Sequence, residues 1–509
     1  MFCGIIPVFS WANQKGASMK SVMTAAAAAF LGTAAMAMAA RNLAPPAPSS
    51  PAGKQEFPQV SLSSETTNDV ELVWLDIRTS PVSQVKSVVA LPGRWNGRLW
   101  FFGNGGAAGT CDPRGPLDMA ARGIVGVHSD MGTGNPPETL PMETIVDFGH
   151  RATHLTLVEA KKIVEEHYGC LPSACYFEGQ STGGGQGIHE AMRYPDDFDG
   201  IMCGVPANVR MPLHVYFWYA RREMRKDGKP VFAKAELEAV RDAARQVLGK
   251  DDPEWCRGKF LLDTTWTQER EGAVLARARE IAPSLGDADK LARLHRILKG
   301  PEIDGKLVHT GLPFGTLLED FEGLQFILRW YVGQHADIDK VDESVVRRWV
   351  AEYSPHLDAT SPDLDAFRAR GGKLFVFAGL EDPIVPCAPI ADWYTSVVSR
   401  LGSQDAADTF MRFYLLPGRA HGGGSGVVEL KGRNEALVDW VEKGVAPGTL
   451  DGFLSGGGTR PVAPWRAPVA VRSQQEAGTA RGCAQEPRPA PSAAFTSCAG
   501  NGILSARLP

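Results

Sequence analysis

The residues most able to do chemistry surround a serine at position 181. The string Gly179-Gln180-Ser181-Thr182-Gly183 has the form Gly-x-Ser-x-Gly, with an apolar stretch before it and an amphipathic stretch after it. A sharp turn from a strand to a helix exposes a serine hydroxyl, and it needs glycines because a Cβ would clash in so tight a bend. The pattern therefore predicts a nucleophilic serine, with a glycine-rich turn that does no chemistry as the alternative.

A nucleophilic serine needs a histidine to take its proton and a carboxylate to orient that histidine. Asp382 follows an apolar run at residues 373–378, and His421 lies in a glycine-rich loop after the run at 412–416. The order Ser, Asp, His along the chain is that of the α/β-hydrolase fold, where acid and histidine lie on loops after later strands. The alternatives are Glu381 as the acid and a purely turn-forming role for Asp382.

Attack on a carbonyl group also needs N–H groups that stabilise the negative charge on its oxygen. One should come from Thr182, directly after the serine and at the start of the predicted helix. The second should come from Gly105 or Gly106, in the loop Gly103-Asn104-Gly105-Gly106 that follows a short apolar run. Glycines let a backbone come close to a substrate; a plain glycine turn is the alternative.

The elements that must position these residues are strands alternating with helices. Such alternation predicts a mostly parallel sheet covered on both faces, and so an α/β-hydrolase fold with a mostly parallel central sheet. Runs at 71–77 and 85–91 alternate like antiparallel strands at a sheet edge. The predicted buried strands are 98–102, 124–128, 175–177, 201–205, 373–378 and 412–416, and helical periodicity marks 153–167 and 433–443.

The alternation stops between residues 207 and 364, where the chain is charged and helical in character. We expect this segment to be a large, mainly helical lid inserted into a hydrolase core made of residues 41–206 and 365–465. Glycine, proline, arginine and alanine dominate beyond about residue 456, so we expect residues 466–509 to form an irregular tail.

Residues 1–40 have the character of a secretory signal. An alanine-rich apolar stretch ends in Ala37-Met38-Ala39, the small-x-small form of a cleavage site, and Met19-Lys20 precedes it as a plausible true start. This predicts a periplasmic or secreted protein, with an alanine-rich structural helix as the alternative. No later apolar run reaches the roughly 20 residues of a membrane helix, so we expect no membrane span in the mature chain.

Composition excludes some classes of function. The 509 residues are 44% hydrophobic and 22% charged with a net charge of −5, which is ordinary for a globular protein and lacks the basic surface of a nucleic-acid binder. Nine cysteines become eight without the signal, too many for their pairing to be deduced, although Cys170 with Cys175 and Cys483 with Cys498 are plausible local pairs. No cysteine or histidine spacing suits zinc, so we expect no metal.

Taken in order, these motifs resemble the tannase and feruloyl esterase family, which also includes mono(2-hydroxyethyl) terephthalate hydrolase. The likeness spans about residues 71 to 450 and is weakest in the insertion. It implies a serine esterase without a cofactor that hydrolyses a small-molecule aromatic ester, of feruloyl, galloyl or phthalate type, through an acyl-enzyme. The matching strings include Trp95-Asn96-Gly97-Arg98, Gly103-Asn104-Gly105-Gly106, Gly179-Gln180-Ser181-Thr182-Gly183-Gly184, Asp197-Phe198-Asp199-Gly200, and Pro417-Gly418 with His421.

Three departures from the family's pattern concern the site. The family usually has cysteines directly before the serine and directly after the histidine, joined by a disulfide, where this chain has Gln180 and Gly422. Packing and hydrogen bonds must then hold the three residues together. The lid calcium loop is reduced ahead of Asp252-Pro253-Glu254-Trp255-Cys256 and lacks the roughly six to eight oxygens that calcium takes, so we expect no calcium. The usual arginine after the glycines is Gly185.

The resemblance also implies that the lid selects the substrate. An arginine there could pair with a carboxylate and aromatic rings could hold a ring, while ordinary lid packing is the alternative for each residue. For the whole chain, the alternatives are a general carboxylesterase or acyltransferase with the same three residues, or a non-catalytic binding protein; the oligomeric state stays open. The candidate wall residues are Phe217, Trp218, Tyr219, Phe326, Arg329, Trp330 and Tyr331.

Overall fold

The computed structural model describes residues 56–67, 69–134, 139–251, 259–316, 325–333 and 335–468, with only the backbone described at 250–251, 259–260 and 325–326. The signal segment, the reduced calcium loop and the Cys483–Cys498 pair lie outside the described residues and remain predictions.

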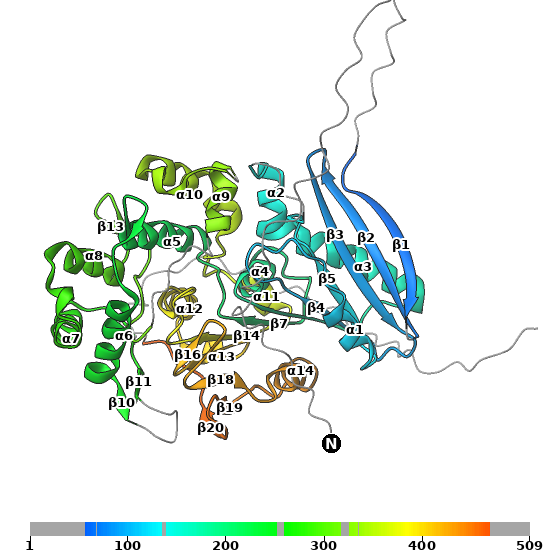
Figure 1. Ribbon diagram of the computed structural model, residues 1–509. Helices are drawn as coiled ribbons and strands as arrows, with labels where there is room; N and C mark the ends of the chain where they lie inside the picture. The colour runs from blue at the N-terminus through cyan, green and yellow to red at the C-terminus, as the bar shows by residue number, and fades with distance from the viewer. Residues whose placement is uncertain are drawn as a thin grey trace, which may run out of the picture. The chain divides into compact units, whose positions relative to one another are not determined.

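A nine-stranded sheet forms the centre of the described chain (Figure 1), in the order β1-β2-β3-β5-β4-β6-β7-β14-β15. The first three strands are antiparallel, and all neighbours from β5 onward are parallel. The mostly parallel sheet predicted from the sequence is therefore present. Its strands are β1 (Gln59–Thr67), β2 (Val70–Ser80), β3 (Ser83–Pro92), β4 (Arg98–Phe102), β5 (Val125–Ser129), β6 (Ala174–Gln180), β7 (Gly200–Gly204), β14 (Lys373–Gly379) and β15 (Met411–Leu416).

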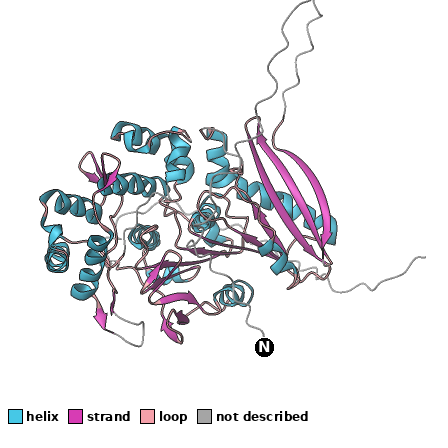
Figure 2. Ribbon diagram, in the orientation of Figure 1, coloured by secondary structure: helices cyan, strands magenta, loops and turns pink. Residues whose placement is uncertain are grey.

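The parallel strands are largely apolar because helices cover both faces of the sheet (Figure 2). On one face Phe101 and Phe177 pack into a core with α3 (Ala152–Tyr168) and α4 (Thr182–Arg193). On the other, Trp100 and Tyr176 pack with residues of α1 (Arg114–Ala120) and α14 (Arg433–Lys443). Neighbouring residues of one strand thus belong to cores on opposite faces of the sheet.

A mainly helical segment joins β7 to its sheet neighbour β14, and we call residues 207–364 of it the insertion. Within the described residues, three two-stranded antiparallel pairs lie between the helices: β8 (Arg225–Lys226) with β9 (Lys229–Pro230), β10 (Lys250–Asp251) with β11 (Lys259–Phe260), and β12 (Glu302–Ile303) with β13 (Lys306–Leu307). Its helical character agrees with the sequence prediction. The helices are α5 (Arg210–Met224), α6 (Lys234–Leu248), α7 (Gln268–Ile281), α8 (Ala288–Lys299), α9 (Gln325–Val332) and α10 (Glu343–Leu357), with α11 (Asp365–Ala369) following before β14.

Strand β1 escaped the sequence analysis because it has no buried face. β1 pairs with β2 along its whole length, yet nearly all of its residues are exposed. Beyond residue 456 we expected little regular structure, but β20 (Thr459–Val462) pairs with β19 (Leu450–Leu454), which pairs with β18 (Val427–Leu430). That expectation was wrong for residues 459–462, because Val462 is buried in the same core as Val427 and Leu430 of β18.

The described cysteines do not form the local pair that we considered. Cys175 carries a free thiol within β6, where burial raises its pKa to about 12, so it is not bonded to Cys170. Cys111, Cys203 and Cys387 are free thiols as well. Across the described ranges, no helix is both long enough and apolar enough to cross a membrane.

Candidate active site

Ser181 occupies the turn between β6 and α4 in an unusual backbone conformation. Its φ is 59° and its ψ is −117°, a region that a non-glycine residue adopts only where its surroundings enforce it. Here the Ser181 N–H donates to the Gly204 carbonyl at 2.9 Å, and the Ser181 carbonyl accepts from Gly185 at 3.1 Å and Ala207 at 2.9 Å. Backbone hydrogen bonds on both sides thus fix the strained turn that presents the hydroxyl.

The glycines around Ser181 are required by backbone contacts. A Cβ on Gly179 would lie 2.5 Å from the Gly183 carbonyl group, and one on Gly183 would lie 2.9 Å from the Asn104 oxygen. Gly185, the position where the resemblance leads one to expect arginine, faces the Ala207 carbonyl, whose oxygen would be 2.9 Å from its Cβ. The turn therefore has no room for side chains at these three positions.

A chain of hydrogen bonds joins Ser181, His421 and Asp382. The His421 Nε2 lies 3.1 Å from the Ser181 Oγ, and the His421 Nδ1 lies 2.8 Å from the Asp382 Oδ2. Asp382 is fully buried, and its Oδ1 accepts the N–H groups of Ile384 and Val385, both at 2.9 Å. With the proton on Nδ1 the carboxylate accepts from it, and Nε2 is left to accept the serine hydroxyl.

The other candidate acid, Glu381, points elsewhere although it is also buried. Its carboxylate accepts from Arg245 of α6 at 2.7 Å. Pro383, directly after Asp382, accepts at its carbonyl from the Tyr216 hydroxyl of α5 at 3.1 Å. Of the two acids only Asp382 contacts His421, and the loop that carries it is tied to the insertion on both sides.

The three backbone N–H groups expected to stabilise an oxyanion are unengaged. Within the described residues, no acceptor takes the N–H of Gly105, Gly106 or Thr182. The loop is tied to the serine turn, because the Gly183 N–H donates to the Asn104 carbonyl at 2.6 Å. A Cβ on Gly105 would meet nothing within 4 Å, so this part of the loop faces open space.

An arginine that the sequence analysis did not single out contacts this loop. Arg210, at the start of α5, donates to the Thr182 Oγ1 at 2.9 Å and to the Gly106 carbonyl at 3.3 Å. The Thr182 hydroxyl donates to the same Gly106 carbonyl at 2.6 Å. The available signal was an arginine flanked by apolar residues in the string Val209-Arg210-Met211.

A side-chain hydrogen bond links Gln180, at the end of β6, to the segment that leads to His421. The Arg419 guanidinium donates to the Gln180 Oε1 at 3.2 Å, and the Arg419 carbonyl accepts the Glu381 N–H at 3.0 Å. The same guanidinium lies 5.4 Å from the ring of Phe377, a cation–π geometry. Arg419 therefore connects the end of β6, the acid loop and the segment that leads to His421.

Two of the candidate wall residues lie next to Arg210. The Trp330 ring meets Phe148 edge to face at 4.7 Å, and the Arg210 guanidinium lies 5.2 Å from the same Phe148 ring. The Tyr331 hydroxyl is 2.6 Å from the His214 Nδ1. Trp330 and Tyr331 are thus within one or two contacts of the Thr182 side of the site.

The remaining candidates lie within the insertion. Phe217 is buried beside His214, and Trp218 donates to the Val341 carbonyl at 3.1 Å. Tyr219 and Arg329 are half-buried. None of these four shows a contact with Ser181, Asp382 or His421, and the side chain of Phe326 lies outside the described residues.

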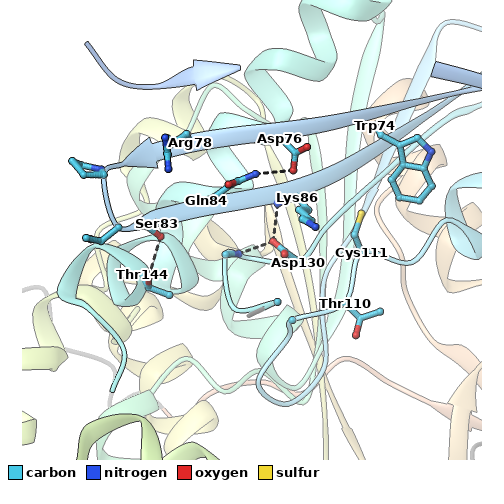
Figure 3. A pocket seen from close by; sticks show the side chains of 15 residues that line it. Trp74, Asp76, Arg78, Ser83, Gln84, Lys86, Thr110, Cys111, Asp130 and Thr144 are labelled. Carbon is cyan, nitrogen blue, oxygen red and sulfur yellow. Dashed lines mark hydrogen bonds between the residues drawn. The ribbon is translucent and has the colours of Figure 1, made fainter. Parts of the chain in front are cut away.

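A cavity of about 960 Å³ lies on the outer strands and not at Ser181 (Figure 3). Trp74, Arg78 and Lys86 of β2 and β3 form one wall, and Cys111 and Asp130 lie opposite. Because no residue of the hydrogen-bonded chain lines it, this cavity is separate from the candidate site.

Comparison with known sequences gives a consistent result. A family model described as "Tannase and feruloyl esterase" matches residues 75–254 and 332–475. The chain is 28% identical over 427 residues to "Feruloyl esterase B" of Aspergillus niger, covering 77% of this chain and 80% of that protein. It is 27% identical over 438 residues to "Probable feruloyl esterase B-1" of Aspergillus flavus, covering 78% and 81%.

Solved structures agree in fold. An esterase from Aspergillus oryzae superposes with a TM-score of 0.67 at 20% identity, covering 81% of this chain and 94% of that one. Feruloyl esterase B from the same organism gives 0.65 at 22%, covering 78% and 86%. These likenesses show that the chain has the hydrolase fold of those esterases.

Proposed function

We propose that this chain, which belongs to the tannase and feruloyl esterase family and is a carboxylic ester hydrolase, cleaves aromatic acid esters with Ser181 as its nucleophile. The observation that carries the proposal is the hydrogen-bonded chain from Ser181 through His421 to Asp382. The strained serine turn and the unengaged N–H groups beside it support the same chemistry.

In the first half of the proposed reaction, the Ser181 Oγ attacks the ester carbonyl carbon while its proton moves to the His421 Nε2. Asp382 keeps the other ring nitrogen protonated and stabilises the imidazolium. The electron pair of the carbonyl moves onto its oxygen, which the N–H groups of Thr182 and of Gly105 or Gly106 stabilise. The tetrahedral intermediate then expels the alcohol, which takes the proton from His421.

The second half repeats these steps with water. His421 removes a proton from water as its oxygen attacks the acyl carbon, and the same N–H groups stabilise the second intermediate. Collapse releases the acid and returns the proton to Ser181. An alcohol in place of water would give acyl transfer, which is the alternative reaction of the same site.

The substrate class in this proposal comes from the family. Its description names tannase and feruloyl esterase, and the relatives carry the second name, so we propose a feruloyl, galloyl or phthalate-type acyl group. The insertion would act as a lid that selects it. Trp330 and Tyr331, near Thr182 through Arg210, are the wall residues that the contacts favour.

A serine-directed fluorophosphonate tests the mechanism. We expect one adduct on Ser181 by mass spectrometry, and loss of both the adduct and turnover in Ser181→Ala with an unchanged unfolding midpoint. Retained turnover in Ser181→Ala, or an adduct on another residue, would sink the serine assignment. If the wild-type chain forms no adduct and shows no turnover, the result would favour a binding protein.

A substrate panel tests the acyl specificity. Methyl ferulate, methyl gallate and a terephthalate half ester should be hydrolysed with a higher kcat/KM than p-nitrophenyl acetate. For this comparison, the kcat/KM of p-nitrophenyl acetate is first corrected for the greater reactivity of its leaving group. Faster hydrolysis of matched methyl esters of short aliphatic acids would favour the general carboxylesterase.

A further inference from the structure

Arg210 is a buried cation without a carboxylate partner. It is 4% exposed, and its hydrogen bonds go to a hydroxyl and a backbone carbonyl, while its Nε is buried without an acceptor. Arg221, on the same helix, is similarly buried but forms an ion pair with Asp339 at 2.8 Å. Within the described chain, Arg210 thus departs from the usual pairing of buried charges.

The cost of this arrangement is visible in the acidity of the group. Burial lowers the pKa of Arg210 to about 10, so the guanidinium remains charged at neutral pH. A nearby carboxylate, Asp358, uses its Oδ1 to accept the Met211 N–H at 2.7 Å, and the Phe148 ring offers a cation–π contact. Because an unpaired buried charge is unfavourable, its presence calls for a reason other than packing.

The position of Arg210 supplies that reason. Its two acceptors belong to the two segments whose N–H groups would form the oxyanion hole, Thr182 on α4 and Gly106 on the loop. The Thr182 hydroxyl donates to the Gly106 carbonyl as well, so three hydrogen bonds close a ring around this point. Gly106 has a φ of 56°, and two donors to its carbonyl hold it in that conformation.

We infer that Arg210 is a positioning residue for the oxyanion hole. We also infer that its positive charge stabilises the anion that forms on the oxygen of the attacked carbonyl. The guanidinium holds Thr182 and Gly106 at a fixed separation. It also places a buried positive charge close to the hole, where electrostatic interactions are stronger than in water. This inference rests on the proposed serine mechanism, because only that mechanism forms an oxyanion beside Thr182.

The test compares Arg210→Met and Arg210→Lys with Arg221→Met as the matched control. For methyl ferulate we expect Arg210→Met to lower kcat roughly 10- to 100-fold with little change in KM, because the lost interaction acts in the transition state. Arg210→Lys should recover part of the rate, since lysine keeps the positive charge but lacks the two guanidinium N–H donors that reach Thr182 and Gly106. Arg221→Met should lower the unfolding midpoint and leave kcat within about twofold.

A phenyl trifluoromethyl ketone gives a readout that a purely structural role would not move. It forms an anionic hemiketal with the serine, whereas the product acid binds without forming one. We expect Arg210→Met to weaken the binding of the ketone by the same factor by which it lowers kcat. The affinity for the product acid should stay nearly unchanged. Equal weakening of both, or a loss of stability without a loss in ketone affinity, would overturn the inference.

Labelling separates this inference from the proposed function. If Ser181 is the nucleophile, the fluorophosphonate still forms its adduct in Arg210→Met, only more slowly. No Ser181 adduct even in the wild-type chain would reject the mechanism itself, while an adduct at an unchanged rate in Arg210→Met would reject the role of Arg210. Should Arg210→Met fail to fold, the kcat and ketone affinity of Arg210→Lys, which keeps the charge but loses one of the two bonds, decide the question.

Discussion

Ser181 and His421 meet in the candidate active site, but the chain holds them by different means. The serine turn is fixed by backbone against backbone, with Gly179 and Gly183 in contacts that leave no room for a Cβ. His421 lies in a loop where a Cβ on Gly422 would meet nothing within 4 Å, and side-chain hydrogen bonds through Arg419 anchor the segment before it. The close backbone contacts leave no room for a side chain at the two glycines. A side-chain hydrogen bond such as that of Arg419 can instead be replaced by another interaction that holds the same segments together.

The same contrast bears on Gln180 and Gly422, the two positions where the resemblance implies cysteines. The Gln180 side chain accepts a hydrogen bond from Arg419, and a Cβ on Gly422 would meet nothing within 4 Å. The bond from Arg419 to Gln180 ties the two segments together here, and Arg433 and Asn434 hold Glu178 of the same strand at 2.8 and 2.9 Å. The expectation that hydrogen bonds would hold the site together thus has identifiable partners.

The largest effect is expected on the histidine side, from Asp382→Asn. Its oxygen can still accept from Ile384 and Val385, but its amide would face the His421 Nδ1 and favour the wrong tautomer. We expect kcat to fall roughly 10³- to 10⁴-fold with little change in unfolding midpoint, measured by steady-state kinetics and thermal melting. A greater loss in Glu381→Gln than in Asp382→Asn, at equal stability, would show that the acid is misassigned.

Glycine-to-alanine changes compare the two sides directly. Gly179→Ala places a Cβ 2.5 Å from the Gly183 backbone, so we expect the free energy of unfolding to fall by roughly 2–4 kcal/mol and turnover to fall with it. Gly422→Ala should change the free energy of unfolding by less than about 0.5 kcal/mol. Urea unfolding measures both, and similar costs at the two positions would contradict the contrast drawn here.

Removing the side-chain tie should have a moderate effect. Arg419→Met replaces a buried guanidinium with an apolar side chain, and we expect kcat to fall roughly 3- to 10-fold because the segment before His421 loses its bond to Gln180. The matched control is Arg412→Met, whose guanidinium binds backbone carbonyls away from the site. An unchanged kcat in Arg419→Met would mean that packing alone positions His421.

The same comparison can be sharpened by restoring the covalent link. In Gln180→Cys combined with Gly422→Cys, oxidation should form a disulfide, raise the free energy of unfolding by roughly 2–4 kcal/mol, and recover the rate lost in Arg419→Met. Reduction should abolish both gains. A disulfide that forms without restoring the rate would show that Arg419 does more than hold the loop.

The last prediction concerns stability alone, at the carboxyl group of Glu190, which is buried in α4. Burial and the nearby charge of Asp197 raise the pKa of Glu190 well above 4.5. Above about pH 4.5 the unfolded chain releases this proton and the folded chain keeps it, so stability falls as pH rises, by up to roughly 1.4 kcal/mol per unit. Glu190→Gln should remove this slope just above pH 4.5 in urea titrations; an identical slope in both proteins would contradict it.

The sequence predicts those parts of the fold and the site whose signal is local. Continuous apolar runs mark the parallel strands because they are buried on both faces, and chain order marks Ser181, Asp382 and His421 as candidates. The strand β1 has no buried face and gives no such signal. Arg210 and Arg419 could not be ranked from sequence, because their roles depend on neighbours such as Thr182 and Gln180 that only the fold brings near. The choice between Glu381 and Asp382 likewise needed the loop's geometry.

The ion pair between Arg245 and Glu381 limits how this protein can be recombined with its relatives. Arg245 belongs to the insertion, while Glu381 directly precedes Asp382 and is 3% exposed. A chimera that received a foreign insertion without this arginine would leave Glu381 buried and uncompensated, at a cost of roughly 3–5 kcal/mol. Exchanging the insertion to change substrate preference would thus also disturb the loop that carries Asp382.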